Sequence, residues 1–231
     1  VASTKKHNIG KIENAIDPFS PQFIIDLKNN LNNFKNRNND PWLIGVFVHN
    51  EIHWGKNLDI PIELLKLSNS PARSALESFF QTKYSSIKKM NQEWSSNYKN
   101  FKNINDQIDI KNQKILSDLK DFFEFYVDYY FKTVDREFRK VFPNHLYLGC
   151  RLYEKTHGNK IVRKIAAKYC DVLSYNVYKY SIDEFDFFKN LNKPVIIGEF
   201  HFGTGTHGVW GTGLRVAYNL EQQAELYKQF V

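Results

Sequence analysis

Two glutamates in this sequence stand just after short apolar runs. Glu51 comes after the run at residues 43–48 and two polar residues, and Glu199 comes after P-V-I-I-G at residues 194–198. Short apolar runs of this kind are typical of strands buried in a parallel sheet, and (β/α)8 barrels carry their catalytic groups at the carboxyl ends of such strands. Aromatic rings and histidines follow both glutamates. Paired carboxylates among aromatic rings indicate an enzyme that acts on a sugar.

Cleavage of a glycosidic bond with retention of configuration gives each carboxyl group a separate task. One carboxylate attacks the anomeric carbon while one carboxylic acid protonates the departing oxygen, and the two groups lie about 5 to 5.5 Å apart. We expect neighbouring strand ends to hold Glu51 and Glu199 at such a spacing. The acid must stay protonated, which apolar packing by Trp54 and the charge of the other glutamate would favour.

Other polar side chains and rings at strand ends are candidates for substrate binding. Arg151 and Tyr178 stand at the ends of two further predicted strands, where they would keep Glu199 ionised. His201 is predicted to donate a hydrogen bond to the sugar. Rings after strand ends often stack on sugar faces, although these rings could also belong to the core. The predicted substrate-binding residues are Asn50, His53, Trp54, Arg151, Asn176, Tyr178, His201 and Trp210.

Metal and nucleotide chemistry have little support in the sequence. His53, His201 and His207 form neither H-x-x-x-H nor H-E-x-x-H, so no zinc site is predicted. The glycine-rich segments 203–206 and 211–213 do not include the lysine of a phosphate-binding loop. We expect them to form a mobile lip of a cleft, and we expect no cofactor.

Helices and strands are predicted to alternate along the chain. The expected helices cover residues 21–36, 84–94, 110–142, 160–168, 182–191 and 220–231, with a further helix starting at 71. Ser20 and Pro21 have the residue types of an N-cap and first helical position. The expected strands begin at residue 42 or 43 and cover 145–151, 171–178 and 194–200, whereas residues 1–16 are predicted to be a loop. This alternation predicts an α/β fold with a parallel sheet covered by helices.

The strand count predicts an incomplete (β/α)8 (TIM) barrel. A closed barrel needs eight strands and about 250 residues, whereas only four strands are predicted here. We therefore expect residues 1–231 to form a partial TIM-barrel catalytic domain, about strands 4 to 7, with a long helical insertion at about 55–110. The chain would then be a fragment of a longer enzyme. An open four-stranded α/β domain is the alternative.

Composition and charge distribution indicate which classes of binding partner to expect. The chain has 231 residues, is 42% hydrophobic and 16% aromatic, and carries a formal charge of +7. Its lysines are scattered among asparagines and do not form a basic patch, so no nucleic-acid partner is predicted. No apolar run reaches the ~20 residues of a membrane span, and no signal peptide is recognisable. Cys150 and Cys170 are expected at opposite ends of the sheet and therefore unbridged.

Four ordered motifs resemble glycoside hydrolase family 50, the β-agarases, which belongs to a clan of retaining (β/α)8-barrel glycosidases. They are D-P-W-L-I-G-V-F-V-H-N-E-I-H-W from residue 40, H-L-Y-L-G-C-R from 145, D-V-L-S-Y-N-V-Y from 171 and P-V-I-I-G-E-F-H-F-G from 194. The resemblance extends over residues 17–231. His49 departs from the family pattern, which tends to have Asp there, and the loop 204–213 differs in shape.

The resemblance implies roles for particular residues. Glu51 would be the acid/base, Asn50 would hydrogen-bond the sugar 2-hydroxyl and Glu199 would be the nucleophile. It also implies secreted or periplasmic action on an oligo- or polysaccharide such as agarose, without a metal. Two other hypotheses remain open: a non-catalytic carbohydrate-binding half-barrel, and a β-glycosidase of the same clan that acts on another glycan.

Overall fold

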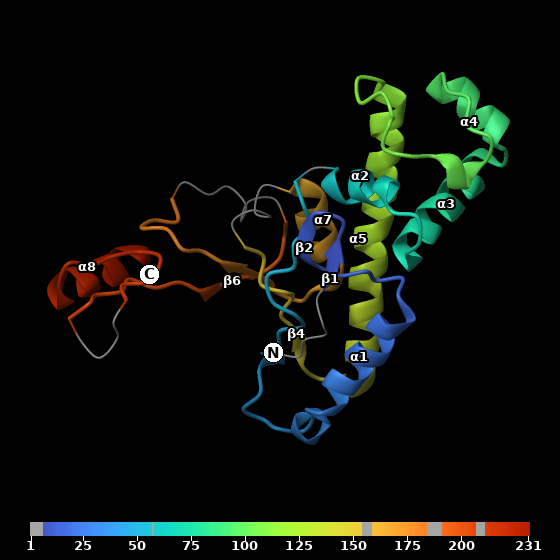
Figure 1. The fold of residues 1–231 in the computed structure, drawn as a ribbon. Helices are drawn as coiled ribbons and strands as arrows, with labels where there is room; N and C mark the ends of the chain where they lie inside the picture. Colours follow the sequence, from blue (N-terminus) through green and yellow to red (C-terminus); the bar gives the residue numbers. More distant parts are fainter. Residues whose placement is uncertain (1–6, 57, 154–158, 184–190, 207–210) are drawn as a thin grey trace.

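A single long helix organises the fold. The computed structural model describes residues 7–56, 58–153, 159–183, 191–206 and 211–231. Helix α5 (Gln113–Val141) has 29 residues and begins where the Asn112 side chain accepts hydrogen bonds from the Lys114 and Ile115 amides. Apolar side chains recur along it at helical spacing and are buried, among them Phe122, Tyr126 and Tyr130. In Figure 1 this helix runs through the molecule, with α3 and α4 on one side of it and β4 and β6 on the other.

The remaining helices pack around α5 or extend from it. Pro21 and Pro71 begin α1 and α3, as the sequence predicts, and Ser70 caps α3, whereas the Ser20 side chain makes no capping hydrogen bond. Helix α2 was not predicted. The predicted helix at 182–191 lies mostly outside the described residues. The helices are α1 (Pro21–Asn32), α2 (Asp59–Lys66), α3 (Pro71–Tyr84), α4 (Ile87–Trp94), α7 (Lys160–Tyr169) and α8 (Leu220–Phe230), with 3-10 turns at Lys35–Arg37 and Phe101–Asn103.

Four parallel strands follow the predicted order but are shorter than expected. They are β3 (Gly45–Val46), β4 (Leu146–Tyr147), β5 (Leu173–Asn176) and β6 (Val195–Glu199). Strand β3 pairs with β4 and β5 pairs with β6, both in parallel, while a parallel bridge between Leu152 and Tyr175 connects the two pairs. The fold is therefore a mixture of helices and parallel strands, and the four strand ends point in one direction.

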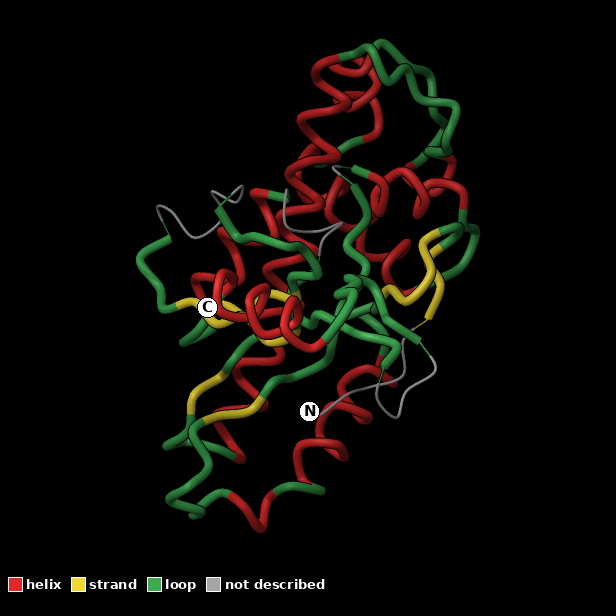
Figure 2. The backbone as a smooth tube through the Cα atoms, turned by 90° about the vertical axis from the view of Figure 1, so that its left-hand side faces the viewer, coloured by secondary structure: helices red, strands yellow, loops and turns green. Residues whose placement is uncertain are grey.

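The N-terminal segment is a hairpin, not the predicted loop. Strands β1 (His7–Ile9) and β2 (Ile12–Ala15) pair antiparallel around Gly10, whose φ of +55° suits a tight turn. Figure 2 shows this hairpin apart from the parallel strands. Ile9 and Ala15 are buried in the main core. The sequence does not predict this hairpin, because strands of three or four residues are too short to show a clear alternation of apolar and polar residues.

The prediction that the first parallel strand is buried on both faces is wrong. Trp42 is 91% exposed and Ile44 is 76% exposed, and Ile196 on β6 is 41% exposed. By contrast, Val48 is fully buried. Within the described residues, apolar side chains in and next to these strands are therefore partly buried and partly exposed.

Both cysteines are buried free thiols, as the sequence predicts. Burial raises the pKa of Cys170 well above its usual value, and the charge of Cys150 adds to this shift. The two thiols are therefore close enough to interact electrostatically, although the sequence predicts them at opposite ends of the sheet. None of the helices in the described part of the chain is long and apolar enough to cross a membrane.

Candidate functional site

Glu199 is held at the end of β6 by a cation and a phenol. The Arg151 guanidinium lies 2.7 Å from its Oε1, and the Tyr178 hydroxyl donates a hydrogen bond of 2.7 Å to its Oε2. Both contacts agree with the sequence prediction. Together they use both oxygens of the carboxylate and fix its orientation, since hydrogen bonds to an ionised acceptor are among the stronger ones in proteins.

Glu51 is held by a neutral amide. The Asn176 side chain, which is 1% exposed, donates from Nδ2 to Glu51 Oε1 over 2.7 Å and lies 3.4 Å from Asn50 Oδ1. The backbone NH of Glu51 donates to the carbonyl of Cys150 over 3.1 Å. Residues at the ends of β3, β4 and β5 therefore combine to position this carboxyl group.

The two glutamates belong to one cluster. Asn176, which holds Glu51, stands opposite Glu199 in the register of β5 and β6. Burial raises the pKa of Tyr178 to about 12, and the hydrogen bond to Glu199 and the charges of both Glu199 and Glu51 contribute to the rise. Since a charge must be near a phenol to raise its pKa, both carboxylates lie close to the same ring.

A glycine permits this close arrangement. A Cβ atom at Gly198 would lie 2.8 Å from Arg151 Cδ and 3.2 Å from Asn176 Oδ1. Any larger residue would push away the side chains that hold the two glutamates. The glycine in the motif G-E-F-H-F thus has a steric role beside the site.

Backbone strain concentrates at these strand ends. His49, Glu51 and Arg151 have φ values of +66°, +50° and +46°, a region that non-glycine residues rarely adopt. His49 is fully buried, and its Nδ1 lies 2.7 Å from the Tyr130 hydroxyl of α5. Strain of this kind persists only where surrounding contacts enforce it, and it is common at active sites.

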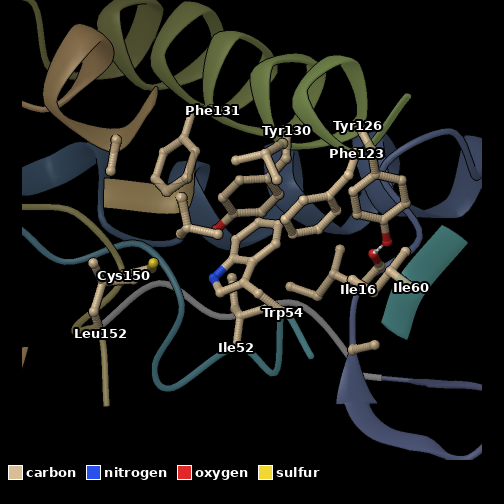
Figure 3. Packing of buried hydrophobic residues seen from close by; sticks show 14 of the residues in the cluster. Ile16, Ile52, Trp54, Ile60, Phe123, Tyr126, Tyr130, Phe131, Cys150 and Leu152 are labelled. Carbon is tan, nitrogen blue, oxygen red and sulfur yellow. Dashed lines mark hydrogen bonds between the residues drawn. The ribbon is translucent and has the colours of Figure 1, made fainter. Parts of the chain in front are cut away.

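The expectation that Trp54 stacks on a sugar is wrong. Its side chain is 1% exposed, stacks on Phe131 at 5.7 Å and meets Tyr130 edge-on at 5.0 Å. Figure 3 shows it beneath α5 among these rings. The chain turns back into the core after Glu51, so this tryptophan contributes packing. Phe202, another ring after a strand end, is also in the core and packs on Phe230.

Of the histidines predicted to bind substrate, His53 and His201 both lie within the described residues. His201 packs edge-on against Tyr178 at 5.1 Å, and its Nε2 accepts a hydrogen bond of 2.8 Å from the backbone NH of Leu214. With Nε2 as the acceptor, the ring proton of His201 is on Nδ1. Trp210 and His207 lie outside the described residues.

Tyr153 was missed by the sequence prediction. Its ring stacks on His53 with centroids 4.8 Å apart and an interplanar angle of 19°. Burial and the charge of Glu51 raise its pKa to about 12. The available signal was its position two residues after Arg151 at the same strand end, where an aromatic ring faces the same edge of the sheet.

Comparison with known proteins identifies β-agarases as relatives of this chain. No protein-family model matches the sequence. The chain is 32% identical to β-agarase B of Vibrio sp. (strain JT0107) over 93% of its length, and 29% identical to β-agarase A of the same organism over 83%. It spans 24% and 21% of those two proteins. The chain is thus similar to about a quarter of each relative.

Solved structures match the fold equally well. The agarase AgWH50C has a TM-score of 0.79 at 31% identity, covering 93% of this chain and 32% of that one. An exo-β-agarase has a TM-score of 0.81 at 32% identity, covering 93% and 31%. PfGH50B has a TM-score of 0.83 at 30% identity, covering 98% and 35%. The similarity therefore includes nearly all of this chain and about a third of each structure.

Proposed function

Since this chain is β-agarase-like, of the glycoside hydrolase family 50 type, over nearly its whole length, we propose that it forms part of a retaining glycoside hydrolase. The substrate is a galactan such as agarose, cleaved at its β-galactosidic bonds. The observation that carries the proposal is the cluster in which Arg151 and Tyr178 hold Glu199 while Asn176 holds Glu51. The strands described here would be four of the eight strands of a (β/α)8 barrel.

The different partners of the two glutamates suit different roles. The Arg151 guanidinium and the Tyr178 hydroxyl hold both oxygens of Glu199, which suits a nucleophile that must be oriented towards the anomeric carbon. The Asn176 amide donates to Oε1 of Glu51 and orients this second carboxyl group. Carboxyl groups with such contrasting surroundings are how one site supplies both a nucleophile and an acid.

The reaction then proceeds in two displacements. Glu199 attacks the anomeric carbon, the bond to the leaving oxygen breaks, and Glu51 gives its proton to that oxygen. Asn50 would hydrogen-bond the sugar 2-hydroxyl. In the second step Glu51 takes a proton from water, the water oxygen bonds to the anomeric carbon, and Glu199 is released. The configuration at that carbon is retained.

Single amide substitutions in the full-length protein that carries this chain test the proposal. We expect Glu51→Gln and Glu199→Gln each to lower turnover of agaro-oligosaccharide by about 10³-fold or more, since each removes the acid or the nucleophile. Glu225→Gln is the control, because Glu225 is exposed on α8 and far along the chain from the site. Wild-type activity in either glutamate variant would exclude its role.

Two further outcomes separate the alternatives. Release of a sugar with inverted configuration, observed by NMR, would exclude Glu199 as nucleophile. Tight binding of agaro-oligosaccharide by the unaltered protein without any cleavage would favour a non-catalytic carbohydrate-binding protein.

A further inference from the structure

The segment that carries Glu51 is attached to α5 through a buried tyrosine. Tyr130 belongs to α5 and is fully buried. Its hydroxyl lies 2.7 Å from Nδ1 of His49, two residues before Glu51. Its ring meets the ring of Trp54, three residues after Glu51, edge-on with centroids 5.0 Å apart (Figure 3). One side chain of α5 therefore contacts both ends of the segment 49–54.

The side chains at the ends of this segment point away from solvent. His49 is 0% exposed and Trp54 is 1% exposed, so neither ring can touch a sugar. Ile52 is buried as well, whereas Asn50 and Glu51 are half-buried. The inward side chains thus anchor the segment, and the two side chains proposed to meet the sugar lie between the anchors.

The backbone of this segment needs contacts that enforce its shape. His49 and Glu51 have φ values of +66° and +50°, a conformation that persists only where the surroundings enforce it. The backbone NH of Glu51 donates to the carbonyl of Cys150 over 3.1 Å, which ties the segment to the chain after β4. The contact between His49 and Tyr130 ties it to α5. The direction of the Glu51 side chain therefore depends on attachments to two different elements.

We propose that Tyr130 is a positioning residue for Glu51, and that its hydroxyl acts through His49 to hold the strained segment that aims the acid at the glycosidic oxygen. This inference rests on the proposed function. Glu199 stands on another element, at the end of β6. Loosening the segment 49–54 should therefore disturb the acid more than the nucleophile, and the loss should appear where a proton must be given to the leaving group.

Two substrates with different leaving groups test the inference in the full-length protein. Tyr130→Phe keeps the ring and removes only the hydroxyl. We expect it to lower kcat/KM about tenfold for an agaro-oligosaccharide, whose departing sugar oxygen needs a proton. For the matching dinitrophenyl glycoside, whose phenolate departs without a proton, we expect no change. Equal losses on both substrates, or no loss on either, would overturn the inference.

The matched control is Tyr126→Phe. Tyr126 lies one turn earlier on α5 and is also fully buried, but its hydroxyl donates to the carbonyl of Ile16, just after the N-terminal hairpin. We expect its removal to leave the ratio of the two kcat/KM values as in wild type. A control that shifts this ratio as far as Tyr130→Phe does would show that any buried hydroxyl of α5 has the same effect, and would contradict a specific role for Tyr130.

His49→Asn removes the same hydrogen bond from its other side. Asparagine tolerates the left-handed backbone conformation, so this variant removes the ring without adding strain at φ. We expect the same selective loss on the oligosaccharide. The double variant with Tyr130→Phe should lose no more than His49→Asn alone, because both changes break one interaction. Losses that multiply in the double variant would mean that the two side chains act independently, against the inference.

Hydrogen exchange separates this inference from the proposed function, because it requires no activity. The reporter is the amide of Glu51, which is protected by its bond to the carbonyl of Cys150. By mass spectrometry, we expect the peptide 48–54 to exchange about tenfold faster in Tyr130→Phe, with no change over residues 115–122 of α5. Unchanged exchange at 48–54 overturns the inference even if the protein is an active hydrolase. Faster exchange in a protein whose wild type never cleaves agaro-oligosaccharide supports the holding role and contradicts only the proposed function.

Discussion

The charges of both Glu199 and Glu51 affect the pKa of Tyr178. It donates to Glu199, packs against His201 and has its pKa raised in part by the charge of Glu51. A raised pKa keeps the phenol protonated, so it remains a donor at any pH at which the protein would work. We therefore expect its hydroxyl to orient the carboxylate of Glu199.

Removing this hydroxyl should weaken catalysis without disturbing the fold. We expect Tyr178→Phe to lower kcat/KM about 10- to 100-fold, which corresponds to the loss of a hydrogen bond to a charged group. Tyr180→Phe is the control, since the Tyr180 hydroxyl bonds only with the backbone of Val216 among the described contacts. Steady-state kinetics of both variants on the same oligosaccharide make the comparison. A Tyr178→Phe protein with wild-type kcat/KM would contradict the orienting role.

At the scale of elements, a buried carboxylate joins α3, α4 and α5. Asp118 on α5 is fully buried and accepts hydrogen bonds from Tyr84 of α3 and Trp94 of α4, the latter over 2.6 Å. Lys83 lies 2.8 Å and Lys114 3.0 Å from its Oδ1. A buried charge is tolerated only when its partners compensate for lost hydration, so these contacts determine how the three helices meet.

The Asp118 cluster should make stability depend on pH. Burial by itself would raise the pKa of Asp118, but hydrogen bonds from Lys83, Tyr84 and Trp94 outweigh it and the pKa is lowered. A lowered folded-state pKa stabilises the protein at pH values above the unfolded pKa, and this stabilisation is lost as the pH falls through the folded value. We expect Asp118→Asn to reduce the free energy of unfolding by about 3 kcal/mol at pH 7.

Urea denaturation at pH 7 and at pH 3 measures this dependence. The difference between wild type and Asp118→Asn should shrink at the lower pH, because the carboxyl group of the unfolded wild type takes up a proton there while the folded carboxylate, with its lowered pKa, resists protonation. Asp121→Asn is the control, because Asp121 shares Lys83 but is itself 47% exposed. A difference that stays constant with pH would mean that the cluster acts by packing alone.

At the scale of the whole molecule, apolar side chains in and beside the parallel strands face outward. Trp42, Ile44 and Ile196 are 91%, 76% and 41% exposed. Apolar surface of this kind promotes association with other apolar surface. The 231 residues by themselves are therefore expected to self-associate.

Polar substitution at two of these side chains should reduce self-association. We expect Ile44→Thr combined with Ile196→Thr to shift sedimentation of the 231-residue chain towards monomer, because both changes remove exposed apolar area. Ile110→Thr is the matched control, since Ile110 is 61% exposed in the segment before α5. Equal effects of the double variant and the control would show that these side chains are not the cause.

The sequence by itself determined which segments become helices and parallel strands and which glutamates stand at strand ends. Apolar spacing, proline positions and short apolar runs are local properties, so they can be recognised without any knowledge of neighbours in space. The same reasoning predicted that Arg151 and Tyr178 would accompany Glu199, because strand ends in a parallel sheet share one edge. Helix α2 and the N-terminal hairpin were missed because each is too short for a clear period.

Only the tertiary structure decided which rings are core and which face the site. Trp54 and Tyr153 each follow a strand end, yet Trp54 is buried under α5 while Tyr153 stacks on His53 beside Glu51. The tertiary structure also placed the hairpin against the chain after Glu51 and joined Asn176 to that glutamate. Local sequence cannot encode these outcomes, because they depend on which distant segments supply the opposing surface and on the positive φ values that turn the chain after β3 and β4.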